Sequence, residues 1–168
     1  MTESTGSRER GEHLADTVAD DDVRVRVAAV ARRATPREER AREAAELIRR
    51  AGGYRWVGLY DVLDEEIAVV AWSGPGAPAH PRFPRERGLS GAAVRTGEPV
   101  VVQDVAADPR YLPTLGGTRA EAIVPVRSPS SGAVVGTIDV ESDRAGAFTD
   151  ADRALLAACA AAVAPLWP

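Results

Sequence analysis

The chain has 168 residues, a formal net charge of -4, 45% hydrophobic residues and 27% charged residues, a composition typical of one globular domain. All 21 basic residues are arginine, which excludes Schiff-base enzymes, protein kinases and phosphate loops that end in lysine. One cysteine and two histidines are too few for a disulfide framework, a thiolate zinc site or an imidazole-rich metal centre. We therefore expect no metal and no cofactor, and the negative charge argues against nucleic acid as a partner.

The first residues show no targeting signal. The stretch MTESTGSRER is polar and lacks the apolar core of a signal peptide. No stretch of the sequence approaches the roughly 18 apolar residues that span a bilayer. We therefore expect a cytoplasmic protein without a membrane partner.

The amino-terminal segment is acidic. Residues 1–22 hold seven carboxylates against Arg8 and Arg10, and such a segment buries too little apolar surface to offset its ordering entropy. We expect residues 1–21 to form a mobile acidic tail and residues 22–168 to form a single domain that begins with two helices.

Two helices are expected before the first strand. Apolar residues at helical spacing over residues 23–31 predict the first helix. Thr35, followed by Pro36 and by Glu38 three residues later, has the pattern of a capping box with proline at the first helical position. The second helix should begin there and end at the glycine pair 52–53.

The rest of the chain is predicted to alternate between strands, loops and two further helices. A short helix over residues 88–97 has Ser90 as its expected cap. The last helix should begin at a capping box formed by Thr149 and Asp152, and Cys159 lies in its apolar stripe, which indicates a buried structural thiol. Strands are predicted at 54–62, 66–72, 100–102, 121–126 and 133–141.

Strands joined mainly as hairpins predict an antiparallel sheet with helices packed on one side, an α+β fold. No glycine-rich turn follows a strand, as a doubly wound nucleotide-binding fold would require. Two long irregular segments, 73–87 and 103–119, interrupt the elements. Because loops of this length in a small domain usually form a binding surface, we expect the ligand-binding loops on the other side of the sheet.

The last predicted strand brings carboxylates together. Its period of two places Asp139 and Glu141 on one face and the aliphatic Ile138 and Val140 on the other, and Glu121 lies at the start of the partner strand. Three acids near one point attract a cation and raise one another's pKa. A solvated end of the sheet explains the same pattern without a function.

The first predicted strand adds aromatic residues. Trp56, Gly58 and Tyr60 share one face, where a glycine between two aromatic rings leaves room for a ligand. The same two rings fit a hydrophobic core equally well.

Several motifs follow one another in the order RWVGLY, WSGPGAPAH, QDV, AEAIVPV and GTIDVES with FTDAD. On these motifs the sequence resembles a GAF domain over residues 53–166, roughly two-thirds of the chain. More narrowly, it is similar to the free methionine-(R)-sulfoxide reductases, GAF proteins that reduce the free oxidised amino acid. The resemblance implies a GAF-like antiparallel sheet and a pocket for a small molecule.

The resemblance also implies site residues. The tryptophan and tyrosine that contact the ligand in the family fall on Trp56 and Tyr60, and its pocket glutamate falls on Glu121. Its paired aspartates fall on Asp139 and on Glu141, which is one methylene longer. The family's cysteine positions depart from the pattern, because His80, Ser90 and Thr114 occupy them here.

These departures decide the expected chemistry. The family reduces sulfoxides with thiols that pass through a sulfenic acid and a disulfide, and no hydroxyl replaces a thiol in that role. For His80, Ser90 and Thr114 we favour a role as polar pocket lining or as ordinary loop residues. A hydrolytic site formed by the same three residues would need a histidine hydrogen-bonded to the serine and an orienting acid.

We expect a non-catalytic GAF domain with a sensory or regulatory role, which binds a small polar ligand such as a free amino acid or its derivative. The acids suit an ammonium group, and Trp56 suits the apolar part of such a ligand. Alternatives are a reductase-like enzyme with altered or residual activity, and a scaffold kept for dimerisation. A homodimer is expected, with contacts from residues 22–50 and from the last helix.

Overall fold

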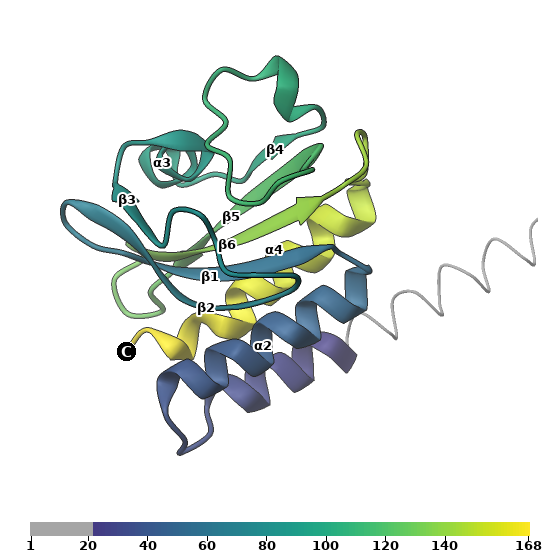
Figure 1. The fold of residues 1–168 in the computed structure, drawn as a ribbon. Coiled ribbons are helices and arrows are strands. Elements are labelled where there is room, and N and C mark those ends of the chain that lie inside the picture. Colours follow the sequence, from purple (N-terminus) through teal and green to yellow (C-terminus); the bar gives the residue numbers. More distant parts are fainter. Residues whose placement is uncertain (1–21) are drawn as a thin grey trace, which may run out of the picture.

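The computed structural model describes residues 22–168, which form a six-stranded antiparallel sheet flanked by helices (Figure 1). The spatial order of the strands is β3-β2-β1-β6-β5-β4. The pairing of β1 with β6, which lie far apart in the sequence, joins the two predicted hairpins into one sheet. The strands are β1 (Trp56–Val62), β2 (Glu66–Ser73), β3 (Arg82–Pro84), β4 (Val100–Val102), β5 (Ala120–Arg127) and β6 (Val134–Ser142).

The longer helices cover one face of the sheet, as the sequence predicts. They are the helical residues 22–31, α2 (Arg37–Gly52) and α4 (Asp150–Val163), which continues into a short 3-10 turn at Ala164–Leu166. The apolar stripes of these helices pack on the aliphatic face of β6, where Ile138 and Val140 are fully buried. This layer holds the main hydrophobic core of the described chain, so the opposite face of the sheet is left to the loops.

One short helix lies on the loop face. The helix α3 (Gly88–Thr96) packs Leu89 and Ala93 against Ile123 of β5. Arg87 precedes its first turn and no side-chain cap is present, so the predicted capping role of Ser90 is wrong. Ser90 lies instead inside the first turn and is buried.

The helix caps agree with the sequence at two of the four predicted places. Thr149 and Asp152 form the predicted capping box of α4, and Gly53 ends α2 in the left-handed conformation with φ 63°. The capping box predicted at Thr35 is wrong, because Pro36 is the N-cap and no side chain caps α2. The start of α2 is anchored by a tertiary contact instead.

That contact is an ion pair between Arg37 and Asp61 at the end of β1. The Arg37 guanidinium donates to both carboxylate oxygens, at 3.0 and 2.5 Å. The indole Nε1 of Trp167 donates to the same carboxylate at 2.6 Å, and the Arg37 guanidinium stacks 5.2 Å from the Trp167 ring centre. The first turn of α2, the end of β1 and the carboxyl-terminal segment are thereby held together.

The structure adds an edge strand that the sequence did not indicate. β3 pairs with β2 through Ile67 and Phe83, inside the segment expected to be a loop. Prolines flank it, and proline is tolerated in a strand at a sheet edge because no partner needs its N–H. Among the described residues no helix is both long and apolar enough to cross a membrane. The predicted acidic tail, residues 1–21, lies outside the described residues.

Candidate functional site

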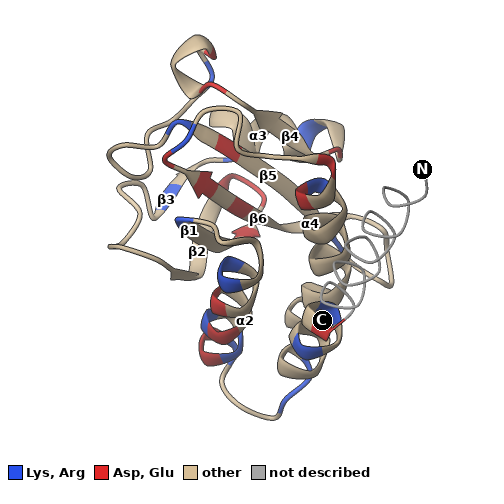
Figure 2. Cartoon of the chain, turned by 90° about the vertical axis from the view of Figure 1, so that its right-hand side faces the viewer, with Lys and Arg blue, Asp and Glu red and all other residues tan. Residues whose placement is uncertain are grey.

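Three carboxylates meet on the loop face of the sheet. Glu121 of β5 pairs directly with Glu141 of β6, and Asp139 lies two residues before Glu141 on the same face of β6. One oxygen from each residue lies within 4.8 Å of those of the other two. All three side chains are at most 4% exposed. The alternative explanation, a solvated end of the sheet, is therefore wrong, because these acids lie inside the protein (the acidic positions of β5 and β6 are red in Figure 2).

The aromatic residues of β1 lie beside this cluster. The register places Trp56 opposite Glu141 and Gly58 opposite Asp139. Both aromatic side chains are buried, with the rings of Trp56 and Tyr60 6.4 Å apart. A Cβ atom on Gly58 would lie 2.4 Å from the Trp56 ring and 2.8 Å from the Tyr60 ring. The glycine therefore makes room for these two rings.

Burial and mutual repulsion shift the protonation of the cluster. Burial, followed by the charge of Glu141, raises the pKa of Glu121 to about 8. Burial, with the charges of Glu121 and Glu141, raises the pKa of Asp139 well above its usual range. The hydrogen bond between Asp139 and Glu121 raises the pKa of Asp139 and lowers that of Glu121, so Asp139 is the member of this pair that holds the proton more tightly.

Glu141 differs from the other two acids because threonine side chains hydrogen-bond to it. Burial raises its pKa, while hydrogen bonds from Thr118 and Thr114 and the charge of Arg55 act in the opposite direction. The hydroxyl of Thr118 donates to Glu141 Oε2. Burial, then the charges of the three carboxylates, also raises the pKa of Tyr60 far above its usual value, so its phenol stays neutral.

Several oxygen atoms of the cluster have no hydrogen-bond partner. Within the described residues, buried oxygens without one include Glu121 Oε2, Asp139 Oδ1, Glu141 Oε1 and Thr137 Oγ1. A buried polar atom without a partner costs about 1–3 kcal/mol of stability. Three carboxyls that converge and each leave an oxygen without a partner suit a bound group that donates several hydrogen bonds and carries positive charge.

Two loops close over the cluster. Trp56 Nε1 donates to the carbonyl of Gly76 at 3.2 Å, and the amide of Ala79 donates to the carbonyl of Thr114 at 2.9 Å. Arg55 donates to the carbonyl of Gly116 at 2.7 Å. The segments around residues 76–79 and 114–118 are therefore bound to β1 and to each other above the carboxylates.

The three polar residues at the family's cysteine positions are not equally close to the cluster. Thr114 is buried, and its side chain lowers the pKa of Glu141. His80 is half-buried next to Ala79, whose amide donates to the Thr114 carbonyl. Ser90 lies in α3. Within residues 22–168 no hydrogen bond joins His80 to Ser90 or Thr114, so the pairing that a hydrolytic site requires is not formed.

Sequence reasoning gave no role to two contributors. Strand periodicity places Thr137 on the same face of β6 as Asp139, and its buried hydroxyl was not counted with the acids. Thr118 reaches Glu141 from the end of an irregular loop, and no local pattern marked it. The single cysteine is as predicted: Cys159 is fully buried in the main core under α4, on the other side of the sheet.

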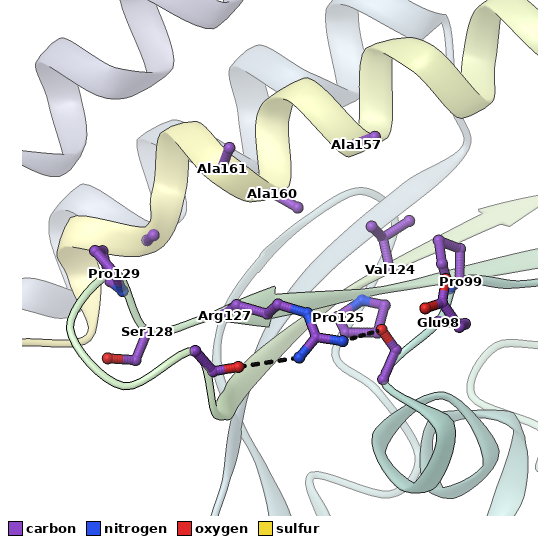
Figure 3. Close-up of a pocket in the computed structure, with 13 residues that line it drawn as sticks. Glu98, Pro99, Val124, Pro125, Arg127, Ser128, Pro129, Ala157, Ala160 and Ala161 are labelled. Carbon is purple, nitrogen blue, oxygen red and sulfur yellow. Dashed lines mark hydrogen bonds between the residues drawn. The ribbon is translucent and has the colours of Figure 1, made fainter.

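A separate cavity of about 630 Å³ lies on the helix side of the sheet, where it is lined by α4, the end of β5 and the turn before β4 (Figure 3). Arg127 crosses it and donates to the carbonyls of Gly97 at 2.7 Å and Gly132 at 3.0 Å. Alanines of α4 form the opposite wall. None of the predicted site residues lines this cavity, so it is distinct from the carboxylate cluster.

Comparison with known proteins agrees with the fold and with the motifs. The family model for the GAF domain matches residues 36–165. GAF domain-containing protein A of Dictyostelium discoideum is 28% identical over 102 residues, which are 60% of this chain and 62% of that protein. The chain therefore spans less than two-thirds of the length of this relative.

Two solved structures of enzymes are also similar. The type II free methionine-R-sulfoxide reductase from Thermoplasma acidophilum is 32% identical with a TM-score of 0.71, covering 78% of this chain and 94% of that chain. The free methionine-R-sulfoxide reductase from Neisseria meningitidis, solved in complex with its substrate, is 28% identical with a TM-score of 0.78, covering 88% and 87%. The family model, the sheet order and these likenesses agree, and the chain belongs to the GAF domain family, with similarity to its free methionine-R-sulfoxide reductases.

Proposed function

We propose that this GAF domain binds a small polar ligand with an ammonium group, such as a free amino acid or its derivative, in a sensory or regulatory role in the cytoplasm. The observation that carries the proposal is the buried cluster of Glu121, Asp139 and Glu141, whose unpartnered oxygens point to a cationic hydrogen-bond donor. The buried ring of Trp56 suits the apolar part of the ligand. Tyr60, His80, Ser90 and Thr114 complete the proposed lining.

Without a ligand, the unpaired carboxyl oxygens lower the stability of the folded protein, and a cationic ligand would remove this destabilisation. Without a cation the three carboxyls stay partly protonated and leave acceptors unpaired. An ammonium group donates up to three hydrogen bonds and supplies the missing positive charge. Binding should therefore release protons from the cluster at neutral pH, since the bound cation favours the ionised carboxylates.

A thermal-shift screen of free amino acids, their sulfoxides and cyclic nucleotides tests the proposal. A ligand present at 100 times its dissociation constant stabilises by about 2.7 kcal/mol, or roughly 5–10 °C for a domain of this size. The matched control is the N-acetyl derivative of each positive amino acid, which lacks the ammonium charge and should give no shift. Equal shifts with and without the ammonium group would contradict the role of the carboxylates.

An enzymatic function is the second candidate, because two similar structures are reductases of free methionine-R-sulfoxide. In that case the sulfoxide would occupy the same pocket and the chemistry would need a thiol. The described chain places its one cysteine, Cys159, in the core on the opposite side of the sheet. We therefore favour binding over turnover.

We further propose a homodimer that uses residues 22–50 and the last helix. Val25 is 60% exposed on the first helix, although Val27 and Val30 of the same helix are buried. Light scattering at micromolar concentration should give about twice the 17.7 kDa mass of the chain. Val25→Asp should shift the population toward monomer, and Leu63→Asp, at a site 42% exposed outside these helices, should not. A monomeric wild type would contradict the proposal.

A further inference from the structure

A second polar cavity, of about 320 Å³, lies between α3 and the segment 109–112. Its volume is at the lower end of the range for small-molecule sites. Three arginines line it, Arg87, Arg95 and Arg110, and Glu86 is the one carboxylate among its described lining residues. In a chain whose net charge is -4, this is a local excess of positive charge.

Two of the three guanidinium groups have no protein partner within the described residues and can bind a ligand. Arg110 is held by Asp108, with Nη2 to Oδ2 at 2.6 Å and Nε to Oδ1 at 3.0 Å. Within residues 22–168 the side chains of Arg87 and Arg95 make no hydrogen bond and no ion pair. Guanidinium groups bind phosphate oxygens through paired N–H donors, so two unpaired arginines on one cavity favour an anion that carries several oxygens.

The cavity wall is built from packed elements. Gly88 begins α3 with φ +75°, and a Cβ there would lie 3.5 Å from the Cβ of Leu112 and 3.8 Å from the carbonyl oxygen of Arg110. Tyr111 packs against the cluster of Leu89, Ala93 and Ile123. The two arginine-bearing segments are therefore fixed relative to each other before any ligand binds. The first turn of α3 also has no acidic residue to compete for the arginines.

The spacing of the arginines indicates the length of the anion. Arg87 and Arg95 are eight residues apart at the two ends of α3, which corresponds to about 12 Å along a helix axis. Side chains that reach toward each other over this distance contact opposite ends of an elongated anion more readily than one compact ion. A phosphate group carries about -1.5 to -2 charges at neutral pH, and linked phosphates match the positive charge of the wall.

We propose that this cavity binds a small molecule through a diphosphate group, with Arg87 and Arg95 at its two ends and the Asp108-paired Arg110 at its edge. The site is separate from the carboxylate cluster and of opposite charge. Tyr111 lies between the two: it lines the cavity, while Thr118 hydrogen-bonds with its hydroxyl and also donates to Glu141.

The test is isothermal titration of the full chain with pyrophosphate and with inorganic phosphate at constant ionic strength. We expect saturable binding of pyrophosphate with one site per chain, at least tenfold tighter than that of phosphate. Arg87→Gln and Arg95→Gln should each weaken it by about tenfold or more, the typical loss for a charge-assisted hydrogen bond. Arg144→Gln, an exposed arginine in the turn after β6, is the matched control and should change affinity less than twofold.

Four results would overturn the proposal. The first is that pyrophosphate shows no saturable binding at millimolar concentration. The second and third are that phosphate, or the dicarboxylate malonate, binds as tightly as pyrophosphate. The fourth is that Arg144→Gln weakens pyrophosphate binding as much as Arg87→Gln and Arg95→Gln do, which would indicate diffuse charge attraction. Both substituted arginines are exposed, so their variants should melt at the wild-type temperature. A variant that melts lower is replaced by Arg87→Lys or Arg95→Lys, which keeps the charge but removes the paired donors and should still weaken binding.

Discussion

The purified protein is expected to show no turnover of free methionine-(R)-sulfoxide with thioredoxin or dithiothreitol as reductant. A thiol-dependent sulfoxide reduction needs an attacking thiolate that becomes a sulfenic acid and then a disulfide. The resemblance to the reductases implies that His80, Ser90 and Thr114 stand where those enzymes carry cysteines. A hydroxyl or an imidazole does not accept the sulfoxide oxygen in this way. The remaining thiol, Cys159, is fully buried in the helix-side core.

A steady-state assay that follows NADPH consumption through thioredoxin reductase measures this directly. Turnover that survives in Cys159→Ser would refute the prediction, because no thiol would then be present. Turnover that is lost in that variant would show that Cys159 reaches the substrate, against its burial in the structure. The triple variant His80→Cys, Ser90→Cys, Thr114→Cys is the informative counterpart: if the pocket still binds the sulfoxide, these thiols should create measurable reduction.

The positions of the carboxylates could be predicted from the sequence because strand periodicity is a short-range property. Asp139 and Glu141 share a face since side chains alternate along β6, and the aliphatic Ile138 and Val140 leave only one face for the core. Glu121 joins them because β5 and β6 are a hairpin, whose register pairs it with Glu141. Their burial did not follow from the pattern, since it depends on loops that arrive from elsewhere in the chain.

Thr118 and the start of α2, which sequence reasoning missed, depend on contacts between distant segments. Thr118 meets Glu141 only because its loop folds back over the sheet. The start of α2 is fixed by Arg37 and Asp61 across 24 residues, and this tertiary ion pair replaces the local cap predicted at Thr35. Local sequence propensity limits where a helix can start or a loop can fold, and packing between distant segments determines which of these possibilities the protein adopts.

The substitution Asp139→Asn should stabilise the protein without ligand and weaken ligand binding. Burial and the charges of Glu121 and Glu141 raise the pKa of Asp139 in the folded state. A raised carboxyl pKa contributes stability that is fully present below the unfolded pKa of about 3.9 and is lost as pH rises toward the folded pKa. Without ligand, the wild type should therefore be less stable at pH 8 than at pH 5, and Asn removes this loss from position 139.

The Asn side chain in Asp139→Asn has nearly the same size and shape as the protonated Asp carboxyl that it replaces. Protonated Asp139 donates to Glu121, and the Asn side chain donates in the same place. Asn does not ionise, so the variant should melt at a higher temperature than the wild type at pH 8. At pH 5 the two proteins should melt at closer temperatures. The exposed Asp143→Asn, just after β6, is the control and should leave both the Tm and its pH slope unchanged.

Affinity is the second half of this prediction. A ligand with an ammonium group loses one charge-assisted hydrogen bond in Asp139→Asn, which should weaken binding by about 1–3 kcal/mol. If Asp139 were a purely structural residue, the same substitution would lower the stability of the unliganded protein and leave affinity unchanged. Melting temperature at pH 5 and pH 8, measured together with affinity for the ligand that the thermal-shift screen identifies, separates the two roles. A destabilised variant with wild-type affinity would end the case for a cation site at Glu121, Asp139 and Glu141, because the cluster would then serve the fold alone.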